Sequence, residues 1–174
     1  ETSANGLLKV SGLSAQDKEY ALSRKAWAAE MKFDFKTAYK ITKELKLSTL
    51  SASERALKLG TLAHMAGFPS EDHFQDYLQS TKDRKGAAAV AAIMIRRSKN
   101  PTKEFRRYSS YLKVQPELYA AVSLEVFAKT RDHLFAEAVL RSMPGIRKTP
   151  SGMILDRFMY IRQFERSFQN RNLI

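Results

Sequence analysis

The chain has 174 residues, with 30 Lys and Arg against 18 Asp and Glu, and it contains no cysteine. This length is typical of one domain that buries roughly 70% of its unfolded surface, and without cysteine there can be no disulfide, thiolate nucleophile or cysteine-ligated zinc. The longest apolar run, Ala87 to Ile95, is nine residues, about half the length of a membrane-spanning helix, so we expect no transmembrane segment. The net charge of +12 leaves three kinds of acidic partner open: nucleic acid, acidic proteins and anionic membrane surfaces.

Residues 1–14 precede the first helix signal, and we expect them to form a flexible segment. The chain begins with Glu1, and its first ten residues contain no apolar signal region, so we expect that any leader has been removed. Together with the absence of cysteine, this favours an exported or periplasmic protein, while a cytosolic location remains open.

Helix start signals recur along the chain, and no segment shows the sustained apolar–polar alternation of a half-buried strand. Two serines are followed by an acid at N-cap spacing, Ser14 with Asp17 and Ser51 with Glu54. Prolines stand where a helix start tolerates them at Pro101, Pro116 and Pro150. These signals predict nine helices, near residues 15–31, 34–46, 52–66, 70–82, 84–98, 101–113, 116–129, 131–143 and 150–170.

The spacing of the predicted helices indicates a repeat. Alternate helices begin at intervals of about 33 residues, a period typical of helix–turn–helix solenoids, in which neighbouring pairs must stack to make a continuous core. We therefore predict an all-α fold, a right-handed solenoid-like stack of about four antiparallel helix pairs with a C-terminal capping helix. Residues 15–148 would form the repeat domain, and residues 149–174 the capping helix and tail. An irregular helical bundle would show similar spacing and remains the alternative.

Two predicted turns have similar sequences, 98 residues apart. Each has an Asp after a tight turn and an Ala four residues later, in Phe33-Asp34 to Ala38 and in Arg131-Asp132 to Ala136. This resembles the tetratricopeptide motif, whose second helix opens with Gly-Asp-Tyr and carries a small residue where the two helices touch. The segment 59–63, Leu-Gly-Thr-Leu-Ala, is similar to that family's Leu-Gly-x-x-Tyr, and Gly67 falls at its inter-helix glycine. The chain departs from the family by having Phe33 and Arg131 where glycine is usual. The resemblance covers roughly residues 15–148 and implies a helical-hairpin solenoid.

Apolar stripes predict which helix faces are buried. Trp27, with Tyr20 and Met31, occupies one face of the first helix, and we expect it to anchor the first hairpin. On the last helix, an apolar stripe is formed by Ile154, Phe158, Ile161 and Phe168. We expect this helix to close the stack, and any part of its stripe that stays exposed leaves self-association open.

Catalytic motifs are absent from the sequence. The three histidines, His64, His73 and His133, lack metal-ligand spacing. The densest acidic group, Glu71, Asp72 and Asp76, begins in a first helical turn, where the helix dipole favours acids. No Gly-rich phosphate loop or Gly-x-Ser-x-Gly elbow occurs. We therefore predict a protein that is not an enzyme and has no cofactor or metal.

Basic residues concentrate in residues 82–113. This segment has ten Lys and Arg against two acids, a difference of +8, which is two-thirds of the net charge in less than a fifth of the chain. In the helix predicted at 101–113, the stripe of Phe105, Tyr108 and Leu112 should face the core, and the cations should lie on another face. The predicted partner-binding residues are Arg96, Arg97, Lys99, Lys103, Arg106, Arg107 and Tyr111. Cations beside an aromatic ring suit acidic peptides or phosphates with stacked bases, although such a face can also be merely solvated.

Two functions follow from these features. The first is a protein-interaction or scaffold module that binds an acidic or extended partner through the basic face. The second is an RNA- or single-stranded-nucleic-acid-binding helical repeat protein, because the segment 135–145 is similar to the second helix and exit of the pentatricopeptide motif. That family places specificity side chains at recurring positions, and the chain shows no such polar recurrence, so the nucleic-acid function ranks second.

Overall fold

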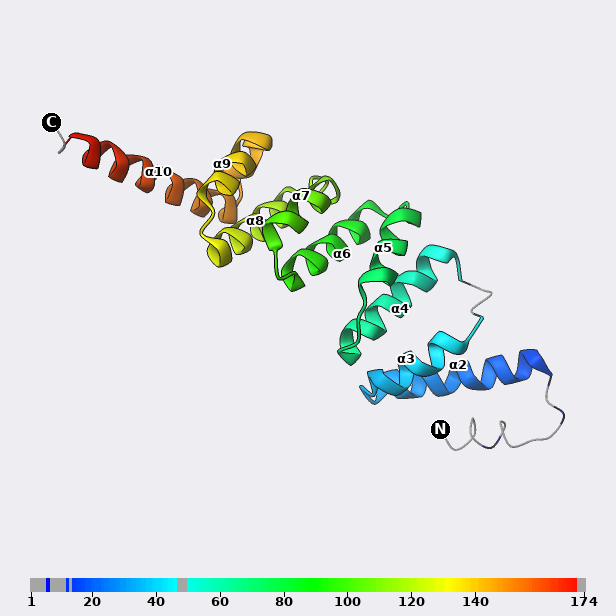
Figure 1. The fold of residues 1–174 in the computed structure, drawn as a ribbon. Coiled ribbons are helices and arrows are strands. Elements are labelled where there is room, and N and C mark those ends of the chain that lie inside the picture. Colours follow the sequence, from blue (N-terminus) through cyan, green and yellow to red (C-terminus); the bar gives the residue numbers. More distant parts are fainter. Residues whose placement is uncertain (1–5, 7–11, 13, 47–49, 172–174) are drawn as a thin grey trace. The chain divides into compact units, whose positions relative to one another are not determined.

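The computed structural model describes residues 6, 12, 14–46 and 50–171, except for the side chains of residues 164, 166 and 168–171. Within these residues the chain is all-α, with nine α-helices, one short 3-10 helix and no strand (Figure 1). The expected flexible segment 1–14 lies almost entirely outside the described residues. No helix in the described part of the chain combines the length and the hydropathy that crossing a bilayer requires.

The chain divides into two compact units, residues 1–81 and residues 82–174. The helices of the first unit are α2 (Ala15–Met31), α3 (Phe35–Glu44), α4 (Ala52–Ala66) and α5 (Glu71–Ser80). Each packs on the next, α2 on α3, α3 on α4 and α4 on α5. The small core between α2, α3 and α4 is built from Ala29, Ala38 and Leu62, with Phe35 and Tyr39 packed against it.

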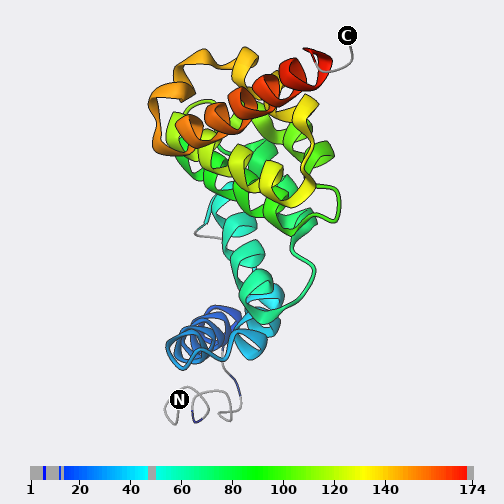
Figure 2. The ribbon, with the colours of Figure 1, turned by 90° about the vertical axis from the view of Figure 1, so that its left-hand side faces the viewer.

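The second unit contains five α-helices and the 3-10 helix. These are α6 (Arg84–Arg97), α7 (Pro101–Leu112), α8 (Pro116–Thr130), α9 (His133–Ser142), η1 (Pro144–Lys148) and α10 (Pro150–Arg171). Consecutive helices pack in pairs, α6 with α7 and α8 with α9, and α8 also contacts α6 and α10. Figure 2 shows α10 lying over α8. The predicted all-α architecture of sequential helix pairs is therefore confirmed.

Local capping residues begin the helices where the sequence predicted. The Ser51 hydroxyl accepts a hydrogen bond from the Glu54 backbone N–H at 3.3 Å, and the Glu54 carboxylate accepts the Ser51 backbone N–H at 2.8 Å. This reciprocal capping box satisfies two backbone donors at the start of α4. Asn100 caps α7 ahead of Pro101 with a single hydrogen bond, by accepting the Lys103 backbone N–H at 3.2 Å.

The two similar turns of the sequence have the same backbone conformation. Phe33 and Arg131 have φ values of 58° and 54°, and among the described residues they are the non-glycine residues with positive φ. Asp34 and Asp132 follow them, and each carboxylate accepts the backbone N–H three residues further along the chain. The two segments therefore resemble each other in backbone structure as well as in sequence.

Small residues allow the paired helices to approach closely. Ala38 and Ala136, four residues after Asp34 and Asp132, are fully buried. At Gly60 of α4, an added Cβ would lie 2.6 Å from ring carbons of Phe74 on α5, so only glycine fits without displacing the ring. Gly67 ends α4 in the left-handed conformation, with φ of 77°, which glycine adopts without a steric penalty.

The predicted burial of the first helix's aromatic face is wrong. Trp27 is 52% exposed, and Tyr20 and Met31 are each 62% exposed. The buried residues of α2 are three alanines, Ala21, Ala26 and Ala29. Alanine side chains allow the backbone of α3 to come close to α2, and the larger side chains on the opposite side of the helix are left facing outward.

The C-terminal helix buries a different face from the one that the sequence indicated. Leu155 is fully buried and Met159 nearly so, whereas Ile154 and Phe158 are 46% exposed and Ile161 is 54% exposed. The helix covers α8, α9 and η1, yet part of its apolar stripe stays accessible. The side chain of Phe168 lies outside the described residues.

Candidate binding surface

Helix α7 is fixed in the second unit by the aromatic side chains of its inner face. Phe105, Tyr108 and Leu112 are buried, as the sequence predicted. The Phe105 ring meets the Tyr119 ring of α8 at a centroid distance of 5.2 Å and the Phe135 ring of α9 at 5.0 Å, both edge to face. These contacts fix the rotation of α7 about its axis, and with it the direction of the outer face.

The outer face of α7 carries cations that face solvent. At about 100° per residue, Lys103 and Arg107 fall on the side opposite Phe105 and Arg106 falls about 100° from it, and all three are exposed. Lys99, in the turn before α7, is exposed as well. Lys99, Lys103 and Arg106 form no ion pair with any described residue, so their charges act outward.

Arg107 is held more firmly than its neighbours. Its guanidinium carbon lies 5.1 Å from the centroid of the Tyr108 ring, and its Nη1 lies 4.0 Å from the Glu104 carboxylate. Its side chain nevertheless remains 56% exposed. The ring contact keeps the guanidinium on the surface of α7 while leaving its outer side accessible.

Arg96 differs from the other predicted site residues because it is paired with an acid. Its Nε donates to Oε2 of Glu125 on α8 at 2.7 Å, and its Nη2 donates to Oε1 at 2.9 Å. These hydrogen bonds raise the pKa of the Arg96 guanidinium, and partial burial opposes them. The pair neutralises Arg96 locally, so this residue adds less to the face than the sequence indicated. No local pattern identifies Glu125, because it lies 29 residues from Arg96.

The two remaining predicted residues lie at the edges of this surface. Arg97 is exposed in the last turn of α6, where a cation complements the helix dipole. Tyr111 is half-buried, and its ring centroid lies 6.5 Å from that of Tyr108. We define the basic face as Lys99, Lys103, Arg106 and Arg107, with Arg97 and Tyr111 at its margin.

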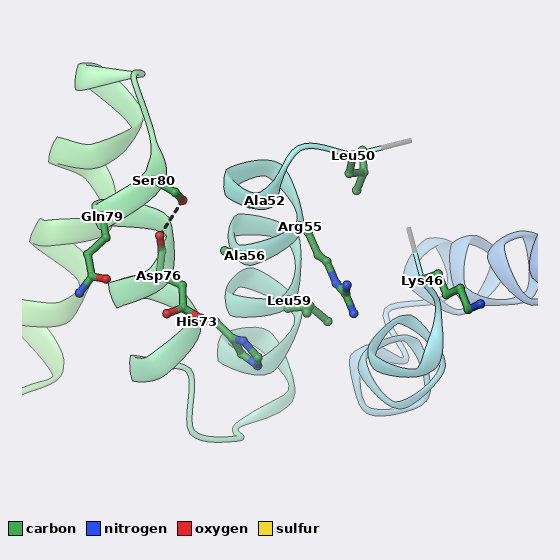
Figure 3. A pocket seen from close by; sticks show the side chains of 10 residues that line it. All are labelled: Lys46, Leu50, Ala52, Arg55, Ala56, Leu59, His73, Asp76, Gln79 and Ser80. Atoms are coloured by element: carbon green, nitrogen blue, oxygen red, sulfur yellow. Dashed lines mark hydrogen bonds between the residues drawn. The ribbon is translucent and has the colours of Figure 1, made fainter. Parts of the chain in front are cut away.

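The first unit contains an open pocket of 680 Å³ that the sequence did not indicate. Figure 3 shows its walls, made by α4, α5 and the segment that precedes α4. Cationic Lys46 and Arg55 line it together with His73 and the carboxylate of Asp76. The charges are therefore mixed, and the His73 ring already shares a 3.1 Å hydrogen bond with the Tyr39 hydroxyl.

The second unit has a smaller cavity of 420 Å³ between α9 and α10. Its lining includes His133 and Arg162, whose buried Nδ1 and Nη1 atoms have no hydrogen-bond partner among the described residues. Asp132 and Glu137 also line the cavity. Across the described residues, no group of three or more His, Asp or Glu side chains converges closely enough to hold a metal ion.

Comparisons with known proteins found no protein-family model, curated protein or solved structure that matches the chain.

Proposed function

We propose that the chain is a non-enzymatic protein-interaction module that binds an acidic or extended partner through the basic face of α7. The observation that carries this proposal is the exposure of Lys103, Arg106 and Arg107 on the outer side of a helix whose inner side is fixed by packing. A partner that brings carboxylates to this face would gain attraction from several charges at once. Charge of this kind mainly raises the association rate and the selectivity of binding.

The helical-hairpin architecture supports the same proposal. Stacked helix pairs resembling tetratricopeptide repeats present long, continuous surfaces to extended partners. Phe105 fixes the rotation of α7 about its axis, and the cations lie on the outer side of this helix. A bound partner would therefore meet them in a fixed arrangement. A scaffold role is consistent with the absence of a catalytic motif in the sequence.

A nucleic-acid ligand is the second candidate, favoured by the position of Tyr111 beside Arg107. Phosphates would pair with the cations while a base stacked on an accessible ring. Such binding falls steeply with salt, because each neutralised phosphate releases a counterion. An acidic peptide binding through fewer charges would show a shallower dependence.

The test is a pair of double charge reversals with equal net charge. The variant R106E/R107E alters the basic face, and K40E/K43E alters two exposed lysines of α3. Binding of a fluorescein-labelled Glu/Gly peptide and of oligo(U) RNA would be measured by anisotropy over a salt series. We expect R106E/R107E to weaken peptide binding by about tenfold or more, because several close charges reverse sign, and K40E/K43E to have a much smaller effect.

The outcomes separate the candidates. Equal losses in the two variants would show that binding follows net charge alone and would refute the basic face. Tight RNA binding with a steep salt dependence, lost in R106E/R107E, would favour the second candidate. Thermal stability should change little in either variant, since exposed substitutions usually alter it by about 0.5 kcal/mol or less. Unfolding of R106E/R107E would instead show that this side of α7 is needed for packing.

A further inference from the structure

Helix α2 is apolar on two opposite faces, and one of them is uncovered. Its alanine face packs on α3. On the other side, Tyr20, Trp27 and Met31 follow one another at helical spacing and are more than half exposed. We call these three residues, together with Phe33 in the following turn, the α2 stripe. A surface helix of a globular protein is expected to be polar on its outer side, so the stripe is a candidate contact surface.

Phe33 is the residue of this stripe that is hardest to explain by folding alone. It is 80% exposed, and its φ of 58° lies in the left-handed region, which is unfavourable for residues with a Cβ. Glycine or asparagine would be more stable at this helix end. The equivalent turn uses Arg131, an exposed charged residue. Phe33 therefore keeps an aromatic ring at the tip of the α2–α3 hairpin, where it is mostly exposed and meets the Phe35 ring edge to face at a centroid distance of 6.0 Å.

Cations accompany the stripe. The Arg24 guanidinium carbon lies 5.2 Å from the centroid of the Trp27 ring, and exposed Lys32 and Lys36 stand on either side of Phe33 in the chain. Residues 15–36 contain five Lys and Arg against four Asp and Glu. Of these acids, Asp34 caps α3 and Glu30 pairs with Lys58 at 3.1 Å. The rings of the stripe thus have cations beside them, Arg24 at Trp27 and Lys32 and Lys36 near Phe33, within a chain of net charge +12.

We propose that the α2 stripe docks on the surface of a bilayer that contains anionic phospholipids. Tryptophan and tyrosine partition to the membrane interface, methionine and phenylalanine enter its apolar edge, and lysine and arginine pair with the headgroups. The 17 residues of α2 span about 25 Å, enough for the helix to lie flat with its stripe in the interface. The stripe lies along one helix and the turn that follows it, and not in a groove between two elements.

Trp27 makes the proposal directly measurable because it is the one tryptophan of the chain. Its emission would be recorded while the full chain is titrated with vesicles of phosphatidylcholine, with or without an equal part of phosphatidylserine. We expect the emission to move to shorter wavelength and to become protected from acrylamide only with the anionic vesicles. No change in Trp27 emission while the protein co-sediments with the vesicles would place the contact elsewhere and overturn the proposal.

Two matched pairs of variants separate docking from folding. Met31 and Met65 are helical methionines of the first unit that are 62% and 55% exposed. We expect M31Q to lower vesicle affinity by about fivefold, because the side chain no longer enters the apolar edge, and M65Q to leave it unchanged. Equal effects of M31Q and M65Q would refute the assignment of the α2 stripe.

The second pair uses the two strained turns. F33G and R131G both place glycine at a left-handed position, so neither should lower the melting temperature. We expect F33G to weaken vesicle binding by about tenfold, since a whole aromatic ring is lost from the interface, while R131G binds normally. Binding of F33G at the level of the unmodified chain would contradict the proposal.

Other occupants of the stripe give distinct results. Emission of Trp27 that shifts with protein concentration alone would indicate a second copy of the chain on the stripe. Quenching by oligo(U) RNA without a response to vesicles would indicate a nucleic acid. Each of these results would overturn the bilayer assignment. The variant R106E/R107E should keep its Trp27 response to anionic vesicles, which separates this proposal from the function proposed for α7.

Discussion

Arg96 and Glu125 form a two-point ion pair that joins α6 to α8. Nε and Nη2 of Arg96 donate to the two carboxylate oxygens of Glu125 at 2.7 and 2.9 Å. The side chains remain 43% and 49% exposed, so water screens the pair. Glu125 therefore stabilises the second unit modestly, and it also removes one positive charge from the margin of the basic face.

Replacing Glu125 should change stability and binding in opposite directions. We expect E125Q to lower the free energy of unfolding by about 0.5–1 kcal/mol, as is typical of an exposed ion pair. The same variant should bind the acidic Glu/Gly peptide more tightly, because the charge of Arg96 is no longer neutralised. E117Q, on the same helix, is the control for net charge, and equal binding gains in the two variants would contradict this account.

Gly60 tests the close packing of α4 on α5. An added Cβ would lie 2.6 Å from two ring carbons of Phe74, which is itself buried. Overpacking costs about 1–3 kcal/mol, whereas alanine improves helix propensity by about 1 kcal/mol, so we expect G60A to be destabilised in urea unfolding. G145A, where an added Cβ meets no atom within 4 Å, should be neutral. A more stable G60A would show that the Phe74 ring can move aside.

Thr149 should be needed for the start of α10. Its buried hydroxyl donates to the Ile146 carbonyl at 2.7 Å and accepts the Gly152 backbone N–H at 3.1 Å. T149V preserves the shape and leaves both backbone groups without this partner, which should cost about 1–3 kcal/mol of unfolding free energy. T61V, at an exposed position of α4, provides the comparison. A similar loss of unfolding free energy in both variants would show that the effect comes from a loss of helix propensity.

Glu54 predicts a dependence of stability on pH. Hydrogen bonds from the Ser51 hydroxyl and then from its backbone N–H lower the pKa of Glu54 below its ordinary value of 4.5. The carboxylate is thus more acidic in the folded than in the unfolded chain, so its stabilisation is present above pH 4.5 and is lost as the pH falls through the lower folded-state pKa. The melting temperature of the unmodified chain should therefore fall more than that of E54Q between about pH 6 and about pH 3. An E54Q curve that follows that of the unmodified chain would exclude this contribution.

The positions of the helices could be predicted from the sequence because their start signals are local. Ser51 caps α4 within three residues, and Asn100 with Pro101 begins α7 in the same way. The inner stripe of α7 was predictable for a similar reason, since Phe105, with its neighbours at helical spacing, gives that helix a single apolar face. The similar turns at Phe33 and Arg131 could also be matched from sequence alone, because the Asp that follows each caps its own helix.

Two features were decided only by the tertiary structure. The sequence of α2 offers two apolar faces, and the close approach of α3 selects the alanines for burial, which leaves Trp27 outside. The neutralising partner of Arg96 lies 29 residues away, so it becomes a neighbour only once α8 has packed on α6. Helical spacing determines which side chains share a face, but the distance of closest approach between helices and the pairing of remote charges depend on which segments meet in space.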